Sequence, residues 1–314
     1  MNKKTILICG YTSFASQGLD TLLQNNGHTV FLFNRGETGM NGNVIRGPIL
    51  DMENNPHLNR KFDVIINYIL LKDESVESNI EFTRAILRLC KKTEASHLIH
   101  LSSIAVYKTF KKKIDENTQV ETRPEKKGLY AAQKLATEND TIEMAPEGLN
   151  ISFLRAGFIL GEGLPDPLVA AGFRTPVKAV LAAGNGASQM PLISRDLLNQ
   201  SIAKVVDTPP TGIEKLLLVS RNSPSKNLYL KMCNEKLKAG KLTLSVSPLV
   251  WLAAAAGGEA VARLAGKSDK NLFSKISELC SDQRFDPSRT EQRLGFQLDM
   301  DWEQELTRSM PNPA

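Results

Sequence analysis

The sequence has few cysteines and no cluster of residues that would bind a metal ion. Its 314 residues include four cysteines that lie far apart, with no CxxC motif and no nearby histidine pair: Cys9, Cys90, Cys233 and Cys280. Because structural zinc needs closely spaced thiolate or imidazole ligands, no metal site is expected. Cys9 and Cys90 lie inside apolar runs, so both are expected to be small core residues.

Long hydrophobic runs are also missing. The first apolar run covers residues 5–9, whereas the core of a signal peptide needs roughly 7–15 apolar residues. The run from Leu249 to Ala256 is too short to cross a bilayer, which takes about 20 residues. We therefore expect a soluble, cytoplasmic protein with no membrane segment.

The chain has no large excess of charge of either sign. Lysine and arginine total 39 against 34 acidic residues, which gives a net charge of +5. This balance suits anionic small molecules, but it falls short of the basic surface that binds nucleic acid. With 41% apolar residues and no repeat or low-complexity segment, the chain can bury a core in one large or two interleaved domains.

The first half of the chain alternates short apolar strands with helical patterns. The predicted strands are Thr5–Cys9, Thr29–Phe33, Val44–Ile45, Asp63–Tyr68, His97–Ser102 and Ile151–Arg155. The predicted helices are Gly18–Asn25, Glu77–Lys92 and Lys127–Met144. Uniformly apolar strands that alternate with helices indicate a parallel sheet covered on both faces, which is a doubly wound α/β fold of the Rossmann type.

The pattern becomes less regular beyond about residue 165. Proline and glycine mark loops there, an alanine-rich helical stretch follows Pro248, and Arg284–Leu294 is predicted to open a final helical segment. Residues 166–314 are therefore expected to form mainly a smaller α/β substrate-binding region. Segments near 190–222 are expected to return to the first domain, residues 1–165.

The turn after the first strand is the candidate site for a dinucleotide. Such turns meet the pyrophosphate with backbone N–H groups and a helix N-terminus. Gly10 can take the tight turn, whereas Ser13 and Ser16 stand where glycines are usual; serine is small and its hydroxyl can donate to phosphate. An ordinary strand–helix turn is the alternative. The candidate cofactor-binding residues here are Gly10, Thr12, Ser13 and Phe14.

The end of the second strand favours NADP over NAD. A carboxylate at this place would accept from the ribose 2′-hydroxyl and repel a 2′-phosphate. Asn34 removes that repulsion, and Arg35 supplies a bidentate phosphate partner; the alternative is a solvated arginine in a turn. Asp51 could reach the adenine edge or cap a helix. Residues 1–165 would then form the NAD(P)-binding domain.

The candidate catalytic residues are Ser103, Tyr130 and Lys134. Tyr130 and Lys134 are four residues apart, so on a helix they share one face. An ammonium group beside a phenol would lower the phenol's pKa, and Tyr130 could then exchange a proton with a carbonyl or alcohol oxygen while hydride moves. Ser103, at the end of a neighbouring strand, would hydrogen-bond the same oxygen. The alternative is an amphipathic helix whose lysine extends to solvent.

These motifs, in this order, resemble the extended short-chain dehydrogenase/reductase family. The resemblance runs from Gly10 through Asp63-Val64-Ile65-Ile66-Asn67, Tyr130-xxx-Lys134, Arg155-Ala156-Gly157 and Ser194-Arg195-Asp196 to Leu294-Gly295-Phe296. It implies NADP or NAD as cofactor, Ser103, Tyr130 and Lys134 as catalytic residues, and Lys134 as a ligand of the nicotinamide ribose. Asn79 resembles a position that supports the active site. Members are mostly nucleotide-sugar epimerases, dehydratases and ketoreductases, and they often form homodimers through a four-helix interface.

The sequence departs from the family in ways that bear on the substrate. Gln189 stands where an arginine would bind a sugar-nucleotide diphosphate, and Arg195 or Arg174 could replace it. Ile104 and Ala105 stand where a 4,6-dehydratase has Asp-Glu, so dehydration is not expected. A ketoreductase and an epimerase share the same catalytic residues, and both stay open. We favour oxidation or reduction of a sugar-like carbonyl or alcohol.

Two functions without catalysis are the alternatives. An NADP-binding regulator would need the dinucleotide turn but not Tyr130. An RNA-binding relative would use a basic rim formed by the lysines at 111–113 and 126–127. No aromatic platform accompanies those lysines, as single-strand binding usually requires, and the complete catalytic set argues for an enzyme acting on a small molecule.

Overall fold

The computed structural model describes residues 2–108, 113–170, 172–174, 179–183, 186–236, 242–246 and 283–310. Its main element is an eight-stranded sheet in the order β13-β8-β6-β5-β1-β2-β4-β3. In that order the strands are Ile213–Leu218, Asn150–Ala156, His97–Ser103, Val64–Asn67, Thr5–Cys9, Thr29–Arg35, Val44–Gly47 and Gly39–Asn41. Every neighbouring pair is parallel except β3 and β4.

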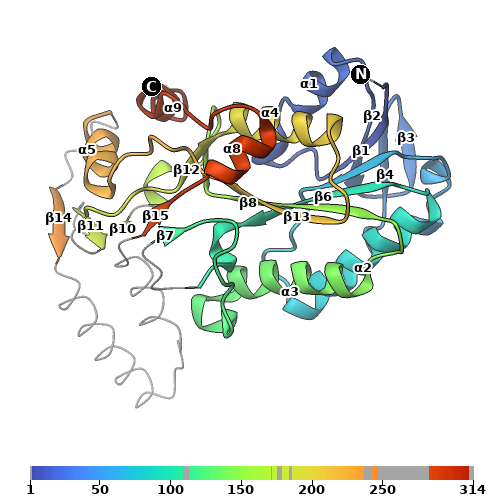
Figure 1. Ribbon diagram of the computed structural model, residues 1–314, viewed down its shortest axis with the longest axis horizontal. Coiled ribbons are helices and arrows are strands. Elements are labelled where there is room, and N and C mark those ends of the chain that lie inside the picture. The colour runs from blue at the N-terminus through green and yellow to red at the C-terminus, as the bar shows by residue number, and fades with distance from the viewer. Residues whose placement is uncertain are drawn as a thin grey trace.

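Helices cover both faces of this sheet, as Figure 1 shows. On the upper face in that view lie α1, α4 and α8, at Leu19–Asn25, Arg195–Asp207 and Ser288–Leu294. On the lower face lie α2 and α3, at Val76–Lys92 and Leu129–Met144. The predicted doubly wound α/β fold is confirmed.

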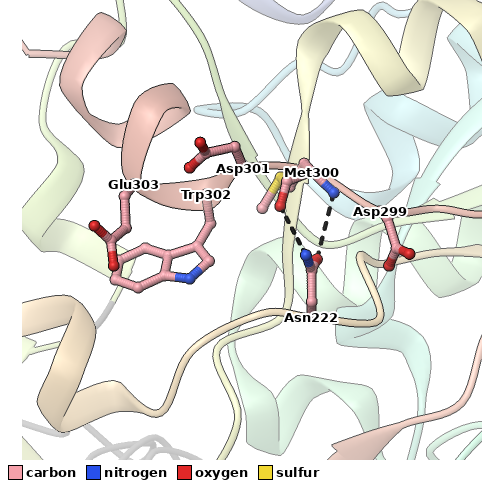
Figure 2. Close-up of a pocket in the computed structure, with 6 residues that line it drawn as sticks. All are labelled: Asn222, Asp299, Met300, Asp301, Trp302 and Glu303. Atoms are coloured by element: carbon pink, nitrogen blue, oxygen red, sulfur yellow. Dashed lines mark hydrogen bonds between the residues drawn. The ribbon is translucent and has the colours of Figure 1, made fainter.

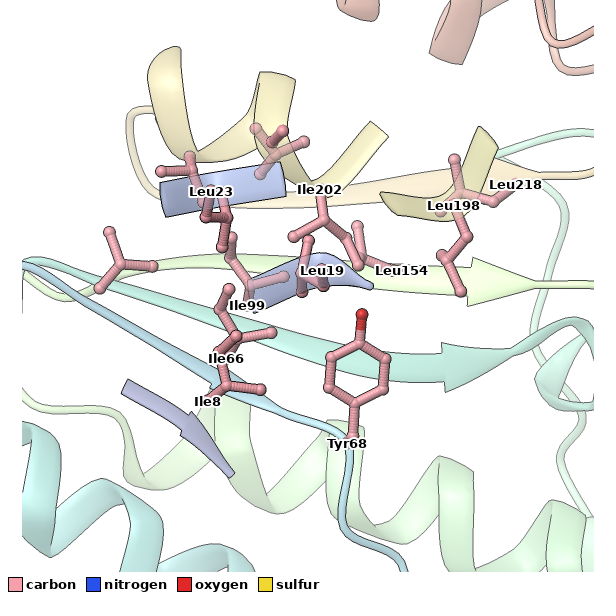
Figure 3. Packing of buried hydrophobic residues seen from close by; sticks show 14 of the residues in the cluster. Ile8, Leu19, Leu23, Ile66, Tyr68, Ile99, Leu154, Leu198, Ile202 and Leu218 are labelled. Atoms are coloured by element: carbon pink, nitrogen blue, oxygen red, sulfur yellow. The ribbon is translucent and has the colours of Figure 1, made fainter. Parts of the chain in front are cut away.

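The two faces of the sheet carry separate apolar clusters. Side chains of a strand alternate between faces, so β1 sends Ile6 and Ile8 to one cluster and Leu7 and Cys9 to the other. Figure 3 shows the first cluster, in which Ile8 lies among side chains of the neighbouring strands and of α1 and α4. Burial on both faces explains why the strands are uniformly apolar.

Cys9 and Cys90 lie in the second of these clusters, and Cys233 lies in a separate apolar cluster. Cys9, Cys90 and Cys233 are buried and unpaired, in agreement with the prediction of small core residues, and Cys280 lies outside the described residues. Among the described residues, no helix is long and apolar enough to span a membrane.

The remaining strands form three small sheets. β10, β11 and β14 form one, β9 pairs with β12, and β7 pairs with β15. Their bounds are Gly172–Arg174, Ala179–Ala183, Leu242–Val246, Phe158–Leu160, Leu192–Ser194, Lys113–Ile114 and Arg284–Phe285. Helices α5 and α9 span Lys226–Lys236 and Trp302–Arg308. Short 3-10 helices η1 to η6 span Phe14–Ser16, Met52–Asn54, Pro56–Leu58, Ile104–Val106, Pro124–Lys127 and Pro167–Ala170.

Two predicted helices begin later than the sequence pattern indicated. Helix α3 starts at Leu129 because Gly128, with φ of 108°, separates it from η5. The predicted helix from Arg284 is a strand for its first two residues, and α8 begins at Ser288 after the Asp286 carboxylate accepts from the Ser288 backbone N–H. The predicted helix after Pro248 lies outside the described residues.

The sheet order creates a point where the chain reverses direction across the sheet. From β1 the chain proceeds to β2 and β4 on one side, and it then returns to β5 on the other side of β1. The connections after β1 and β5 therefore leave the sheet in opposite directions, and a crevice opens between the carboxyl ends of these two strands.

Candidate active site

A cavity of about 850 Å³ lies at this reversal point. Gly10, Thr12 and Ser13, which follow β1, form one part of its wall, and Asn34 and Arg35 at the end of β2 form another. The remaining wall comes from the turn after β4, the segment after β5 and the start of α2: Ile49, Leu50, residues 68–74, Glu77, Ser78 and Glu81. Five of the predicted cofactor-binding residues therefore lie together around one cavity.

The turn after β1 is held by serine where glycine is usual. The Ser16 hydroxyl lies 2.8–3.1 Å from the carbonyl oxygens of Gly10, Tyr11 and Ser13, and it accepts a hydrogen bond from Ser13 Oγ at 3.0 Å. Gly10 itself has no substitute, because its φ is +83° and an added Cβ would lie 2.8 Å from Cγ1 of Ile69. The serines thus stabilise the turn from within.

Phe14 and Arg195 do not line the cavity but contact each other behind it. The Arg195 guanidinium lies 5.0 Å from the centre of the Phe14 ring and donates to Gln17 Oε1 at 2.6 Å and to the Glu162 carbonyl at 2.9 Å. These contacts connect the β1 turn to the loop after β9. The structure therefore places Arg195, the candidate for substrate binding, in a supporting position beside the cofactor turn.

Asn34 and Arg35 differ in how their side chains are used. Asn34 Oδ1 accepts from the backbone N–H of Arg35 at 2.9 Å, which fixes the end of β2. The Arg35 side chain is exposed and lines the cavity. Asp51 lies outside the lining, at the N-cap position of η2, where its side chain makes no cap hydrogen bond. Its carboxylate accepts from Asn54 Nδ2 at 2.6 Å.

Ser103 and Tyr130 meet at the carboxyl end of β6. Their side chains form a hydrogen bond, and Ser103 Oγ also accepts from the backbone N–H of Ala105 at 3.2 Å. Ser103 is buried, whereas Tyr130 is 45% exposed, so part of its ring faces solvent. The pair therefore places a buried serine hydroxyl beside a tyrosine whose side chain is partly exposed.

The expected lowering of the Tyr130 pKa is not observed. Burial of the hydroxyl raises the pKa of Tyr130 above its usual value, and the hydrogen bond with Ser103 opposes this shift. Lys134 is not among the groups that shift this pKa, and its ammonium donates to the Leu101 carbonyl at 2.5 Å. Sequence spacing placed both residues on one face of a helix but could not give the direction of the lysine side chain.

Lys134 is buried beside the cavity. Its burial lowers its pKa to about 8; the Glu138 carboxylate opposes this shift, and the Lys72 ammonium adds to it. Lys72 belongs to the cavity wall. Lys134 thus lies within electrostatic range of the cavity wall, and its charge can change near neutral pH.

A buried ion pair lies below these residues. Arg155 donates from Nε and Nη2 to the two carboxylate oxygens of Glu138 at 3.0 and 2.6 Å, and both side chains are 1% exposed. The Ser102 hydroxyl also donates to Glu138, and the Arg155 guanidinium lies 4.8 Å from the centre of the Tyr107 ring. This network fixes β6, β8 and α3 to one another directly beneath the candidate catalytic residues.

The model of the NAD dependent epimerase/dehydratase family matches residues 6–195. The chain belongs to this family. No curated protein sequence matches it.

Solved structures of epimerases share the fold over almost the whole chain. UDP-N-acetylglucosamine 4-epimerase from Bacillus cereus is 14% identical with a TM-score of 0.66, and the match covers 97% of each chain. UDP-glucose 4-epimerase from Bifidobacterium longum, in complex with NAD+ and UDP, is 20% identical with a TM-score of 0.68 over 97% of this chain and 96% of that one. Human epimerase family protein SDR39U1 with NADPH is 14% identical with a TM-score of 0.65, and the match covers 98% of this chain and 100% of that one.

Sequence reasoning missed one wall of the cavity, the segment from Tyr68 to Glu74. Its position directly after a buried strand of a parallel sheet is a signal that could have found it, because ligands bind beyond the carboxyl ends of such strands. The Tyr68 hydroxyl is buried with no hydrogen-bond partner among the described residues. Figure 3 shows its ring on the side of the sheet that α1 and α4 cover.

The lysines of the hypothetical basic rim are used in other contacts. Lys113 pairs with Asp286 at 2.8 Å, and Lys127 donates to the Tyr107 carbonyl at 2.8 Å. Lys111 and Lys112 lie outside the described residues. These contacts account structurally for two of the lysines that motivated the RNA-binding alternative.

A second hollow of about 500 Å³ lies away from all predicted site residues. In Figure 2 the side-chain amide of Asn222 pairs with the backbone of Met300, at 2.9 Å to its carbonyl and 3.3 Å to its N–H. The other residues that line this hollow are Asp299, Asp301, Trp302 and Glu303. The described residues include no group of three or more residues placed to hold a metal ion.

Proposed function

We propose that this chain is an NAD(P)-dependent oxidoreductase or epimerase that acts on a carbonyl or alcohol of a sugar-like substrate, with nucleotide sugars included in that class. The observation that carries the proposal is the hydrogen-bonded pair of Ser103 and Tyr130 at the carboxyl end of β6. Tyr130 shares helix α3 with Lys134, whose ammonium is close enough to Lys72 in the cavity wall for the two charges to interact. Membership of the family supports a nicotinamide-dependent enzyme.

The nicotinamide cofactor, when bound, supplies or accepts the hydride. Tyr130, whose pKa is raised by burial, is protonated at neutral pH and can donate its proton to a carbonyl oxygen as that oxygen gains charge. Ser103 would hold the same oxygen through its hydroxyl. This protonation state favours the direction of reduction. Oxidation of an alcohol would require Tyr130 to give up its proton first.

NADP is the cofactor that we favour. Arg35 lines the cavity with an exposed guanidinium, and the end of β2 has an amide, Asn34, in place of a carboxylate. A planar guanidinium suits a 2′-phosphate. Carboxylates from the start of α2 and the segment before it also line the cavity, namely Asp73, Glu74, Glu77 and Glu81, and they make NAD the alternative.

The reaction can be tested with two assays on the purified protein. Keto-sugars with NADPH test reduction through the loss of nicotinamide absorbance, and UDP-sugars without added cofactor test epimerisation through NMR of the sugar protons. Turnover in either assay supports the proposal. A protein that binds the cofactor but turns over no member of a broad keto-sugar and UDP-sugar panel would contradict it and leave a binding protein.

A further inference from the structure

The cavity wall after β5 is held from the two helices on the lower face of the sheet. On the α2 side, Asn79 Oδ1 accepts from the backbone N–H of Leu71 at 2.9 Å, and Asn79 Nδ2 donates to the Leu71 carbonyl at 3.0 Å and the Ser75 carbonyl at 2.9 Å. Asn79 therefore fixes both backbone groups of one residue in the wall.

On the α3 side, the contact comes from Gln133. Its Nε2 lies 2.7 Å from the Glu74 carbonyl, 3.1 Å from the Leu71 carbonyl and 3.4 Å from the Lys72 carbonyl. Because all three partners are acceptors, only the amide nitrogen can face them. Gln133 is 1% exposed, so these bonds are sheltered from water.

Gln133 also connects two parts of the site. It directly precedes Lys134 in α3, and its three acceptors belong to residues that line the cavity. The Lys72 ammonium acts on Lys134, so the position of this wall affects the charge at the catalytic helix. A shift of the wall would change the cavity and the surroundings of Lys134 together.

We propose that Gln133 is a positioning residue that fixes the wall segment Ile69–Glu74 to the helix carrying Tyr130 and Lys134, and thereby preorganises the nicotinamide cofactor site. The inference rests on the proposed function for its ligand. When a site already has its bound shape before the ligand arrives, binding loses less free energy to ordering of the protein. Gln133 does not touch the reacting atoms; it acts through the wall.

The test variant is Gln133→Met, which keeps the length of the side chain and removes its donors. The control is Asn150→Leu, because Asn150 also bridges two backbone groups, Ser96 and Gly212, but at the opposite end of the sheet. Amide hydrogen exchange of the free protein and titration with NADPH and NADH are measured for both variants. Loss of one or two sheltered hydrogen bonds corresponds to about a tenfold effect.

Gln133→Met is expected to speed exchange in the peptide covering residues 69–74 and to weaken cofactor binding, each about tenfold. Asn150→Leu is expected to lower the thermal stability while leaving both readouts near the wild-type values. Unchanged exchange in residues 69–74 of Gln133→Met would overturn the inference, and so would equal loss of affinity in the two variants. If the wild type binds neither cofactor, the proposed function fails, and the exchange data alone still decide the role of Gln133.

Discussion

The two ends of the main sheet use buried polar residues differently. At the amino end, His97 Nε2 lies 2.9 Å from Ser152 Oγ, which donates to Glu214 Oε1 at 2.7 Å, and Arg293 Nε donates to Glu214 Oε2 at 2.8 Å. Apart from Nδ1 of His97, which has no partner among the described residues, this network satisfies its own donors and acceptors. It contributes to the fold and leaves little capacity for a ligand.

At the carboxyl end, some polar groups face solvent or lack a hydrogen-bond partner among the described residues. Glu138 and Arg155 form a closed pair, but Tyr130 above them is 45% exposed. Among the described residues, the Lys134 ammonium donates to one backbone carbonyl, that of Leu101, and the Tyr68 hydroxyl has no hydrogen-bond partner. The difference indicates that polar groups at this end retain bonding capacity for a bound molecule, as expected at the reversal point of a doubly wound sheet.

The largest expected effect comes from removing the proton donor. Tyr130→Phe should lower kcat by about 10²- to 10⁴-fold, the range typical of general acid–base catalysis, while cofactor affinity stays within a few-fold of the wild type. Steady-state kinetics and nicotinamide fluorescence measure the two quantities. Tyr107→Phe, which removes a buried hydroxyl outside the cavity, is the matched control. Full turnover by Tyr130→Phe would remove the proton-transfer assignment.

The next prediction compares the ion pairs of the two ends. Glu138→Gln leaves the fully buried Arg155 without its counter-charge and should lower the free energy of unfolding by about 3–5 kcal/mol. Glu214→Gln affects a pair whose arginine is 28% exposed and should cost about 1 kcal/mol or less. Urea unfolding measures both. Equal losses would show that the two networks do not differ as described.

A smaller effect should distinguish the two cofactors. Arg35→Gln should weaken NADPH binding about tenfold, because a charge-assisted hydrogen bond to the 2′-phosphate is lost. NADH, which lacks that phosphate, should bind Arg35→Gln as it binds the wild type. A parallel loss of affinity for both cofactors would place Arg35 elsewhere on the ligand.

The last prediction concerns pH. Burial lowers the pKa of both His97 and His100 from 6.5 to about 3, so each is neutral in the folded protein and becomes protonated in the unfolded chain below pH 6.5. Stability is therefore complete above pH 6.5 and falls toward pH 3, by up to about 1.4 kcal/mol per histidine per pH unit. His97→Asn and His100→Asn should each reduce this slope by a similar amount in urea unfolding at pH 4.5–6.5. An unchanged slope would show that these histidines bind no more protons when unfolded.

The sequence predicted those features that depend on local pattern. Apolar runs predicted the strands of the parallel sheet. The places of Gly10 and Asn34 at the ends of the first two strands predicted that both lie at its carboxyl end, where both line the cavity. The wall segment Tyr68–Glu74 escaped because it carries no recognisable motif.

Side-chain directions also depend on tertiary contacts that no spacing encodes. Lys134 turns to the Leu101 carbonyl and leaves the Tyr130 phenol without its expected charge partner. Arg195 is held by Gln17, a residue 178 positions away in the chain. The fold and five residues of the cavity lining were therefore predictable, whereas the side-chain directions required the structure.

We propose that the cavity at the carboxyl end of the main sheet binds a nicotinamide dinucleotide. Titration of the purified protein with NADPH and NADH, followed by nicotinamide fluorescence after a check for copurified NAD, tests it most directly. The account predicts saturable binding with one cofactor molecule per chain, or copurified NAD that occupies the same site. A protein that contains no nucleotide and binds neither cofactor would contradict the claim.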